Sequence, residues 1–235
     1  MDKYVIKVKR KHVCEESNIA RKNLKDTDDN EKEYNSNKSE MSLFNHNISE
    51  EKNDKISTPS LYENIDINFP GDLARVKVFG KWCDIPRKQV TYGDPGLTYK
   101  YSGITTPAKP WPKTLKAVRD LVNRVTGYDY NFVLVNRYKD GSDKMGEHKD
   151  DEKDLDHNTP IASISLGQPR DFYFRHQDAR PPKSMKIEKV SMLLEHGSLL
   201  LMNPPTNNFW YHALPPRKSA GGLRINLTFR RILRK

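Results

Sequence analysis

A short acidic segment of the sequence contains residue types that could bind a metal ion. Residues 146–152 read Gly-Glu-His-Lys-Asp-Asp-Glu, which places the imidazole of His148 and the carboxylate of Asp150 two residues apart. On an extended backbone, side chains at this spacing point to the same face. His212, in a separate aromatic run, offers a second imidazole. Two histidines and one carboxylate can form a facial triad that binds Fe(II) and leaves coordination positions open, although a solvated acidic loop has the same local pattern.

A second polar pattern begins twelve residues after His212. In residues 224–230, apolar side chains alternate with four polar ones, which are Arg224, Asn226, Thr228 and Arg230. A strand places the two sets on opposite faces. Two buried guanidiniums need anionic partners, so the polar face suits either solvent or a ligand with two carboxylates. Asn136 and Tyr138, again two residues apart, could line the same pocket, or could be a turn-end Asn and a core-edge Tyr.

Length, composition and charge limit the class of protein. The 235 residues suffice for one sizeable domain and a tail, and two cysteines are too few for a disulfide scaffold. Residues 1–60 hold 12 basic and 12 acidic side chains, so the net charge of +10 belongs to residues 61–235. A basic folded segment attracts polyanions such as nucleic acid or an anionic membrane surface. No apolar run is long enough to span a bilayer and no secretory signal opens the sequence, so we expect the cytosol or nucleus.

The folded part is predicted to be mainly β. One amphipathic helix is expected between Pro112 and Gly127, where apolar residues recur at helical spacing. After it, short β-rich runs alternate with Gly, Pro, Asp and Asn, and we expect strands at 131–138, 161–166, 172–174, 187–194, 198–202, 209–213 and 224–229. Many short strands at this spacing indicate a sandwich or barrel, with a jelly roll among the options.

The first 66 residues differ from the rest in composition. Residues 13–66 are rich in Asn, Ser, Glu, Asp and Lys without a sustained apolar period, and we interpret them as a disordered linker. Residues 1–12 form a basic segment in which an aromatic and two aliphatic residues lie between lysines: Lys3, Tyr4, Val5, Ile6 and Lys7. Such a pentamer is either an adhesive tail or a linear motif that recruits a partner through effective concentration.

Taken together, His148-x-Asp150, His212 and Arg224-x5-Arg230 resemble the Fe(II)- and 2-oxoglutarate-dependent dioxygenases. The strings Asn136-Arg137-Tyr138 and Gly146-Glu147-His148 look like those of the AlkB-type nucleic-acid dealkylases. Further strings, such as residues 78–82, 86–89 and 210–212, are most similar to the animal AlkB homologue two group, and the resemblance covers about residues 70–232. It implies a nucleotide-recognition lid with its supporting helix in residues 67–127, and a double-stranded β-helix, or jelly-roll, core in residues 128–235.

The resemblance implies roles for the polar residues. His148, Asp150 and His212 would hold Fe(II). The residues implied to bind the co-substrate 2-oxoglutarate are Asn136, Tyr138, Arg224, Asn226, Thr228 and Arg230. Either arginine could pair with the distal carboxylate of that co-substrate. Dioxygen is the second co-substrate. The implied reaction hydroxylates an N-alkyl carbon, which leaves as formaldehyde while 2-oxoglutarate becomes succinate.

The implied substrate is double-stranded DNA that carries 1-methyladenine or 3-methylcytosine, with the target base turned out of the stack. A finger made of Val78, Phe79 and Gly80 would fill the vacated gap. Further implied substrate-binding residues are Lys81, Tyr99, Lys100, Tyr101, Ser102 and Asp151, where Tyr101 replaces the usual Phe of the group. Phosphate contacts are expected from Arg87, Lys88, Arg217 and Lys218.

Members of the group bind the replicative sliding clamp through a pentamer like that of residues 3–7, so the resemblance implies clamp binding by this segment. It also implies a monomeric nuclear enzyme without membrane contact. Two alternatives stay open at this point. One keeps the chemistry and changes the substrate to RNA or single-stranded DNA. The other is a non-catalytic jelly-roll module with a structural metal.

Overall fold

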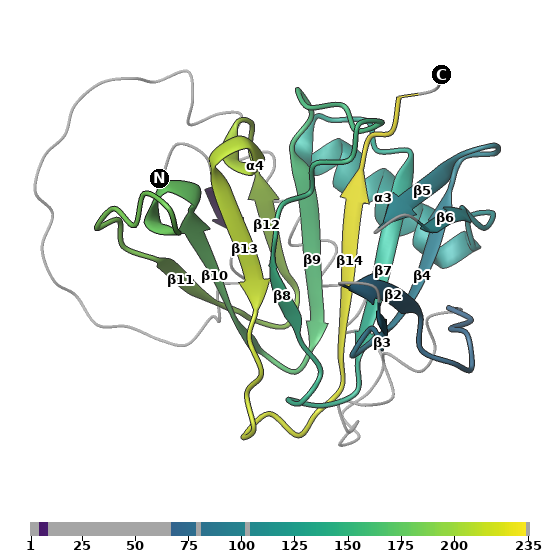
Figure 1. Ribbon diagram of the computed structural model, residues 1–235. Coiled ribbons are helices and arrows are strands. Elements are labelled where there is room, and N and C mark those ends of the chain that lie inside the picture. The colour runs from purple at the N-terminus through teal and green to yellow at the C-terminus, as the bar shows by residue number, and fades with distance from the viewer. Residues whose placement is uncertain (1–4, 9–66, 79–80, 102–103, 234–235) are drawn as a thin grey trace, which may run out of the picture. The chain divides into compact units, whose positions relative to one another are not determined.

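Two antiparallel sheets form the core of the computed structural model, which describes residues 5–8, 67–78, 81–101 and 104–233 (Figure 1). In spatial order, the larger sheet contains β1 (Val5–Val8), β12 (Ser198–Met202), β9 (Ile161–Gly167), β14 (Arg224–Arg230), β7 (Phe132–Tyr138) and β4 (Lys88–Gly93). The smaller sheet contains β11 (Val190–Leu194), β10 (Arg170–His176), β13 (Trp210–Leu214) and β8 (Met145–His148). Two hairpins lie outside these two sheets, and they pair β2 (Arg75–Val78) with β3 (Lys81–Asp84) and β5 (Thr98–Tyr101) with β6 (Ile104–Pro107).

The predicted helix is confirmed as α3 (Lys113–Thr126). Pro112 precedes its first turn, where a missing backbone N–H does no harm. Gly127 ends the helix with φ at 74°, a left-handed conformation that glycine adopts without steric penalty. The other helical turns are η1 (Gln177–Ala179) and α4 (Thr206–Phe209). None of the helices in the described ranges is long and apolar enough to cross a membrane.

Strand β14 divides the interior into an apolar side and a polar side. Ile225, Leu227 and Phe229 pack with Leu115 and Val122 of α3 in one apolar cluster. Figure 1 shows α3 on the far side of β7, the neighbour of β14. The polar set of β14 faces the other way, where residues of both sheets meet. The alternation predicted for residues 224–230 therefore separates a structural core from a lined pocket.

The mainly β expectation is confirmed, and several predicted strands lie where the pattern placed them. Runs 198–202 and 224–229 correspond to β12 and β14, and run 131–138 to β7. Two limits differ. The run 187–194 begins as a strand only at Val190, and the run 209–213 begins at Trp210 because α4 occupies residues 206–209. Strands β1 to β6 and β8 were not predicted, since each is short and most of them mix polar and apolar residues without clear alternation.

Some predictions concern parts of the chain outside the described residues. These are the whole linker at 13–66, the finger residues Phe79 and Gly80, Ser102, and Lys3 and Tyr4 of the N-terminal pentamer. The division into a lid at 67–127 and a core at 128–235 stays an interpretation.

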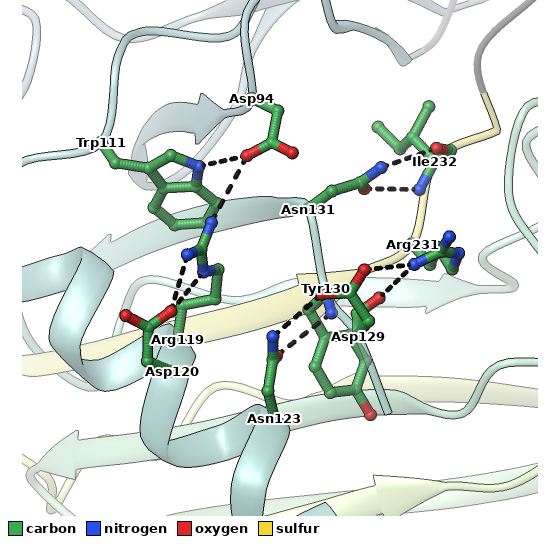
Figure 2. A network of polar contacts seen from close by, with 10 residues as sticks. All are labelled: Asp94, Trp111, Arg119, Asp120, Asn123, Asp129, Tyr130, Asn131, Arg231 and Ile232. Carbon is green, nitrogen blue, oxygen red and sulfur yellow. Dashed lines mark hydrogen bonds and ion pairs between the residues drawn. The ribbon is translucent and has the colours of Figure 1, made fainter. Parts of the chain in front are cut away.

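A polar network ties α3 and the end of β14 to the loop between them (Figure 2). The Asn131 side chain makes both backbone hydrogen bonds of Ile232, donating to its carbonyl at 2.8 Å and accepting from its N–H at 2.8 Å. Asn123 of α3 accepts a hydrogen bond from the Tyr130 N–H at 3.1 Å. Arg231 pairs with Asp129 at 2.6 Å. The network holds the chain directly after Arg230 and so fixes the end of the strand that carries the polar face.

We expect Asn131→Ala to destabilise the protein by about 1–3 kcal/mol, because it leaves two backbone groups of Ile232 without their partners. The matched control is Asp129→Ala, which removes a surface ion pair whose carboxylate is 74% exposed and should change stability by less than about 1 kcal/mol. Urea unfolding of both variants measures the difference. Equal midpoints for the two variants would contradict the anchoring role of Asn131.

Candidate metal and co-substrate site

A pocket between the two sheets is lined by polar residues of β14 and by residues from both sheets. Arg224, Asn226, Thr228 and Arg230 are all buried, and all four line it. Strand β7 pairs with β14 in a register that sets Asn136 opposite Asn226 and Tyr138 opposite Arg224. The structure thus brings together every residue that the sequence predicted for the co-substrate.

His148, Asp150 and His212 approach one another at one end of this pocket. Their ligand atoms lie within 4.8 Å of one another. His148 on β8 and His212 on β13 are direct cross-strand neighbours, with ring centroids 4.2 Å apart. Asp150 follows the end of β8, with its Oδ1 3.6 Å from Nε2 of His148. Strand pairing therefore unites ligands that lie 62 to 64 positions apart in the sequence.

The surroundings of the three residues suit a metal ligand set. Burial lowers the pKa of His212 to about 3, so its imidazole is neutral at physiological pH. Burial would raise the pKa of Asp150, but the Arg230 guanidinium, helped by the two imidazoles, holds it well below its usual range. His148 Nδ1 lies 2.9 Å from the Gly146 carbonyl, a contact that fits a proton on Nδ1 and leaves Nε2 as the ligand atom.

Arg230 is the direct partner of the metal-site carboxylate. Its Nη2 donates to Oδ2 of Asp150 at 2.8 Å, and both side chains are only 4% exposed. Asp150 in turn raises the pKa of Arg230 above its ordinary value, against the effect of burial. The Arg230 guanidinium also lies over the ring of Tyr99, 5.4 Å from its centroid. Arg230 therefore positions Asp150 and leaves its other carboxylate oxygen facing His148.

Arg224 is buried and has no acidic partner among the described residues. Its Nη2 donates to Ser165 Oγ at 2.9 Å, while its Nε and Nη1 are buried without a hydrogen-bond partner in the described part of the chain. Burial lowers its pKa to about 10, so it stays charged at neutral pH. Tyr138 lies beneath the guanidinium, 5.1 Å from its centre. A buried cation with unused donors is a site for an anionic ligand.

The structure corrects the role assigned to Arg87. This residue was expected to contact phosphates, but it is 4% exposed and its Nε donates to Asn136 Oδ1 at 2.7 Å. Its guanidinium lies in the pocket wall and is too buried for a surface phosphate contact. Arg217 is half-buried with Asp171 at 3.4 Å, Lys88 is half-buried, and Lys218 is exposed.

Tyr99 lines the same pocket as the metal ligands and connects it to Glu152. Tyr99 is buried and donates to Glu152 Oε1 at 2.5 Å. Burial raises the pKa of Glu152, and its Oε2 is buried without a partner within the described chain. Asp151 is exposed, as is Lys81. Nothing is described for the side chains of Val78, Lys100 and Tyr101, so their assigned roles stay predictions.

Sequence reasoning missed several residues of the pocket. Arg87 and Gln89 line it, Glu152 accepts a hydrogen bond from the lining residue Tyr99, and Ser163 and Ser165 of β9 bind Asn226 and Arg224. The two serines alternate with apolar residues in the run 161–166, a signal that could have placed them on the same face as the polar side of β14. Arg87 and Gln89 carried no comparable signal.

Behind the metal end, residues that flank the ligands hold the segment 177–180. Glu147 accepts a hydrogen bond from Tyr173 at 3.1 Å and pairs with Arg180 at 3.4 Å. Arg180 lies over the ring of Tyr211, 3.9 Å from its centroid, and Lys149 approaches the same ring at 5.0 Å. The positions next to His148 and His212 therefore tie this loop to the strands that carry the ligands.

The residues present fit a bound Fe(II) ion and a dicarboxylate. The donor set is two imidazoles and one ionised carboxylate, which suits Fe(II) with open positions. The described wall of the pocket carries three guanidiniums, those of Arg87, Arg224 and Arg230, against the one carboxylate of Asp150. Nε and Nη1 of Arg224 and Nδ2 of Asn136, which have no hydrogen-bond partner among the described residues, add hydrogen-bonding capacity for an anion. Fold and site thus define a metal-dependent oxygenase of the two-histidine, one-carboxylate type.

The chain belongs to the 2OG-Fe(II) oxygenase superfamily, whose family model matches residues 74–230. It is an enzyme that uses Fe(II), 2-oxoglutarate and dioxygen. It is 59% identical over 166 residues to the mouse DNA oxidative demethylase ALKBH2, a match that covers 70% of each chain. The human DNA oxidative demethylase ALKBH2 is 58% identical, covering 70% of this chain and 64% of the human one. The human alpha-ketoglutarate-dependent dioxygenase alkB homolog 3 is 34% identical, covering 62% and 54%.

We expect Asp150→Ala to abolish tight Fe(II) binding, because it removes one of three ligands and leaves Arg230 buried without its partner. The loss should exceed the roughly 10- to 100-fold that removal of an outer partner of a ligand causes. Anaerobic calorimetric titration with Fe(II) measures it, with Asp150→Asn as a second variant that preserves shape. The control is Asp151→Ala, an exposed neighbour, which should bind the metal as the natural chain does. Equal affinities in all proteins would contradict the assignment.

Proposed function

We propose that this oxygenase is a DNA-repair oxidative demethylase that removes N-alkyl groups, such as those of 1-methyladenine and 3-methylcytosine, from double-stranded DNA. The observation that carries the proposal is a buried site with three metal ligands and an arginine that has no acidic partner among the described residues, in a chain 59% identical to a DNA oxidative demethylase. The similar ALKBH2 proteins act on DNA, which supports DNA as the substrate. A nuclear site of action follows from that substrate, and we expect the enzyme to act as a monomer.

The two arginines at the ends of β14 have different roles in binding. Arg230 holds Asp150 ionised and oriented through a 2.8 Å contact. Arg224, whose Nε and Nη1 are unused by the described residues, is the better placed to pair with the distal carboxylate of 2-oxoglutarate. Because the pocket is buried, this pairing is stronger than it would be in water. When bound, iron and 2-oxoglutarate supply the oxidation of the alkyl carbon by dioxygen, with release of succinate.

Tyr99, Asp151 and Glu152 are proposed to receive the alkylated base. Tyr99 is buried, with its ring stacked on Phe132 and covered by the Arg230 guanidinium, so it would line the wall of the base pocket rather than stack on the base. Asp151 is exposed beside the metal ligand Asp150, where it can accept a hydrogen bond from an amino group or a cationic ring. Glu152 has one buried oxygen without a partner among the described residues, which could accept a second such bond. After hydroxylation, the alkyl carbon leaves as formaldehyde and the base is restored.

The β2–β3 hairpin supports a duplex substrate. Its paired positions Val78 and Lys81 flank Phe79 and Gly80, the proposed finger. Trp82 on the same hairpin is 55% exposed, and the Arg75 guanidinium lies 5.9 Å from the centre of its ring. Exposed aromatic rings beside cations are typical of surfaces that stack on bases and contact phosphates. Base flipping itself follows from the chemistry, since an enzyme cannot reach a base inside the stack.

Changing each arginine should separate their roles. Arg224→Gln should raise the 2-oxoglutarate concentration for half-maximal activity on the order of 100-fold, since it removes a buried charged partner, while Fe(II) affinity stays near that of the natural chain. Arg230→Gln should weaken Fe(II) binding as well, because Asp150 loses its partner. Succinate formation against 2-oxoglutarate concentration, together with Fe(II) titration, measures both. If Fe(II) affinity falls equally in the two variants, the division is wrong.

The substrate proposal is tested with matched methylated oligonucleotides, single-stranded and duplex, in the presence of Fe(II) and 2-oxoglutarate. Formaldehyde release is the readout. Phe79→Ala should reduce activity on the duplex roughly 10-fold or more, since the unstacked gap costs a few kcal/mol without a wedge, and should leave single-strand activity near its natural level. Tyr128→Ala, an exposed aromatic outside the hairpin, is the control.

The outcome separates the alternatives. Unchanged duplex activity in Phe79→Ala, with high activity on single strands or RNA, would favour a single-strand or RNA demethylase. Absence of iron-dependent succinate formation on every substrate would leave only a metal-binding module.

The N-terminal pentamer of residues 3–7 is proposed to bind the replicative sliding clamp. Its order of basic, aromatic, two aliphatic and basic residues supports this assignment. Binding there would raise the local concentration of the oxygenase at replicating DNA.

A further inference from the structure

Without β1, the strand at this edge of the larger sheet would be β12, which is unusually apolar for an edge strand. Residues 198–202 read Ser-Leu-Leu-Leu-Met and contain no charge and no proline. Leu199 packs in the cluster that contains α3, whereas Leu200 and Met202 pack in the cluster that contains residues of the smaller sheet. β12 is therefore buried on both faces, like a central strand.

Nothing in β12 itself discourages further strand pairing. Its register with β9 runs without a bulge from Ser198 opposite Ser165 to Met202 opposite Ile161. Natural edge strands carry lysines, prolines or bulges, because a bare row of N–H and C=O groups templates pairing with other chains. A flat apolar edge of this kind needs a cover.

The N-terminal strand β1 provides that cover. Its four residues pair antiparallel with β12, from Val5 opposite Met202 to Val8 opposite Leu199. Three of the four are β-branched, a type that favours strands. The new edge contains Lys7 and is flanked by Lys3 and Lys9 in the sequence, so β1 brings the charges that β12 lacks.

Strand β1 is held by few contacts, and a long connection separates it from the next described residues. Only four residue pairs join β1 to β12, and residues 9–66 separate β1 from the remainder of the described chain. Closing so long a connection has an entropic cost that a short ladder must offset. The docked strand is therefore suited to displacement.

We propose that β1 is a displaceable cap on the β12 edge, and that capping excludes binding of the same residues by the sliding clamp. Val5, Ile6 and Lys7 belong both to β1 and to the recruitment pentamer. The backbone groups of these residues that pair along β12 are not available to a second binding surface at the same time. The exclusion, though not the cap, rests on the clamp binding proposed above. Recruitment to the clamp then opens the β12 edge.

The cap is tested by amide hydrogen exchange in the full chain and in Ile6→Pro. Proline has a fixed φ angle and no backbone N–H, so it disfavours the strand and removes one hydrogen-bond donor. In Ile6→Pro, the amides of residues 199–202 that do not pair with β9 should exchange on the order of ten times faster or more. Amides of β14 should be unchanged, which shows that the fold is intact. Lys11→Pro, which lies beyond β1, should behave as the natural chain does. Equal exchange at β12 in all three proteins overturns the cap.

The exclusion is tested by adding saturating sliding clamp to the natural full chain. The same β12 amides should accelerate to the rates seen in Ile6→Pro. If calorimetry detects clamp binding but these amides still exchange slowly, the proposed exclusion is wrong, whereas the proposed binding of the pentamer to the clamp is supported. If the clamp does not bind, the recruitment motif and the exclusion both fail, and the comparison with Ile6→Pro decides the cap alone.

Discussion

The buried ion pair between Asp150 and Arg230 is the interaction on which the site depends. Both side chains are 4% exposed and their atoms are 2.8 Å apart. A buried charge without its partner is strongly destabilising, so neither residue tolerates a large displacement of the other. Because Asp150 follows β8 in the smaller sheet and Arg230 ends β14 in the larger one, the pair ties the two sheets together at the metal end of the pocket.

The rest of the pocket is an electrostatic environment prepared for an anion. Arg224 is charged and lies against Tyr138, and its Nε and Nη1 are buried without a hydrogen-bond partner among the described residues. Phe172 and Phe174 lie 5.7 Å and 6.0 Å from the ring of His212 and exclude water from that ligand. In such surroundings, a carboxylate is bound chiefly by charge-assisted hydrogen bonds. A bound carboxylate would offset the desolvation cost of burying the Arg224 guanidinium.

Different kinds of contact hold the segments around the metal site and at the edge of the larger sheet. The polar network around Asn131 fixes the chain immediately after Arg230 (Figure 2). Glu147, Lys149 and Tyr211, each next to a metal ligand, hold the loop at 177–180. At the far edge of the larger sheet, β1 pairs with β12, two strands away from β14. The segments that carry or flank the ligands are thus held by several ion pairs and hydrogen bonds, while the strand that joins the sheet from the N-terminus is held by four residue pairs.

The sequence by itself determined the features that depend on local spacing. These include the two faces of β14, the limits of α3 and the spacing of His148 and Asp150 on one face of an extended segment, because periodicity and caps act within a few residues. Only the tertiary structure decided which arginine is paired and which is unused, since that depends on Asp150, 80 residues before Arg230. It also showed that Arg87, which we expected at the surface, lies in the pocket wall beside Asn136. Burial and ion pairing join residues far apart in the chain, and no local pattern contains that information.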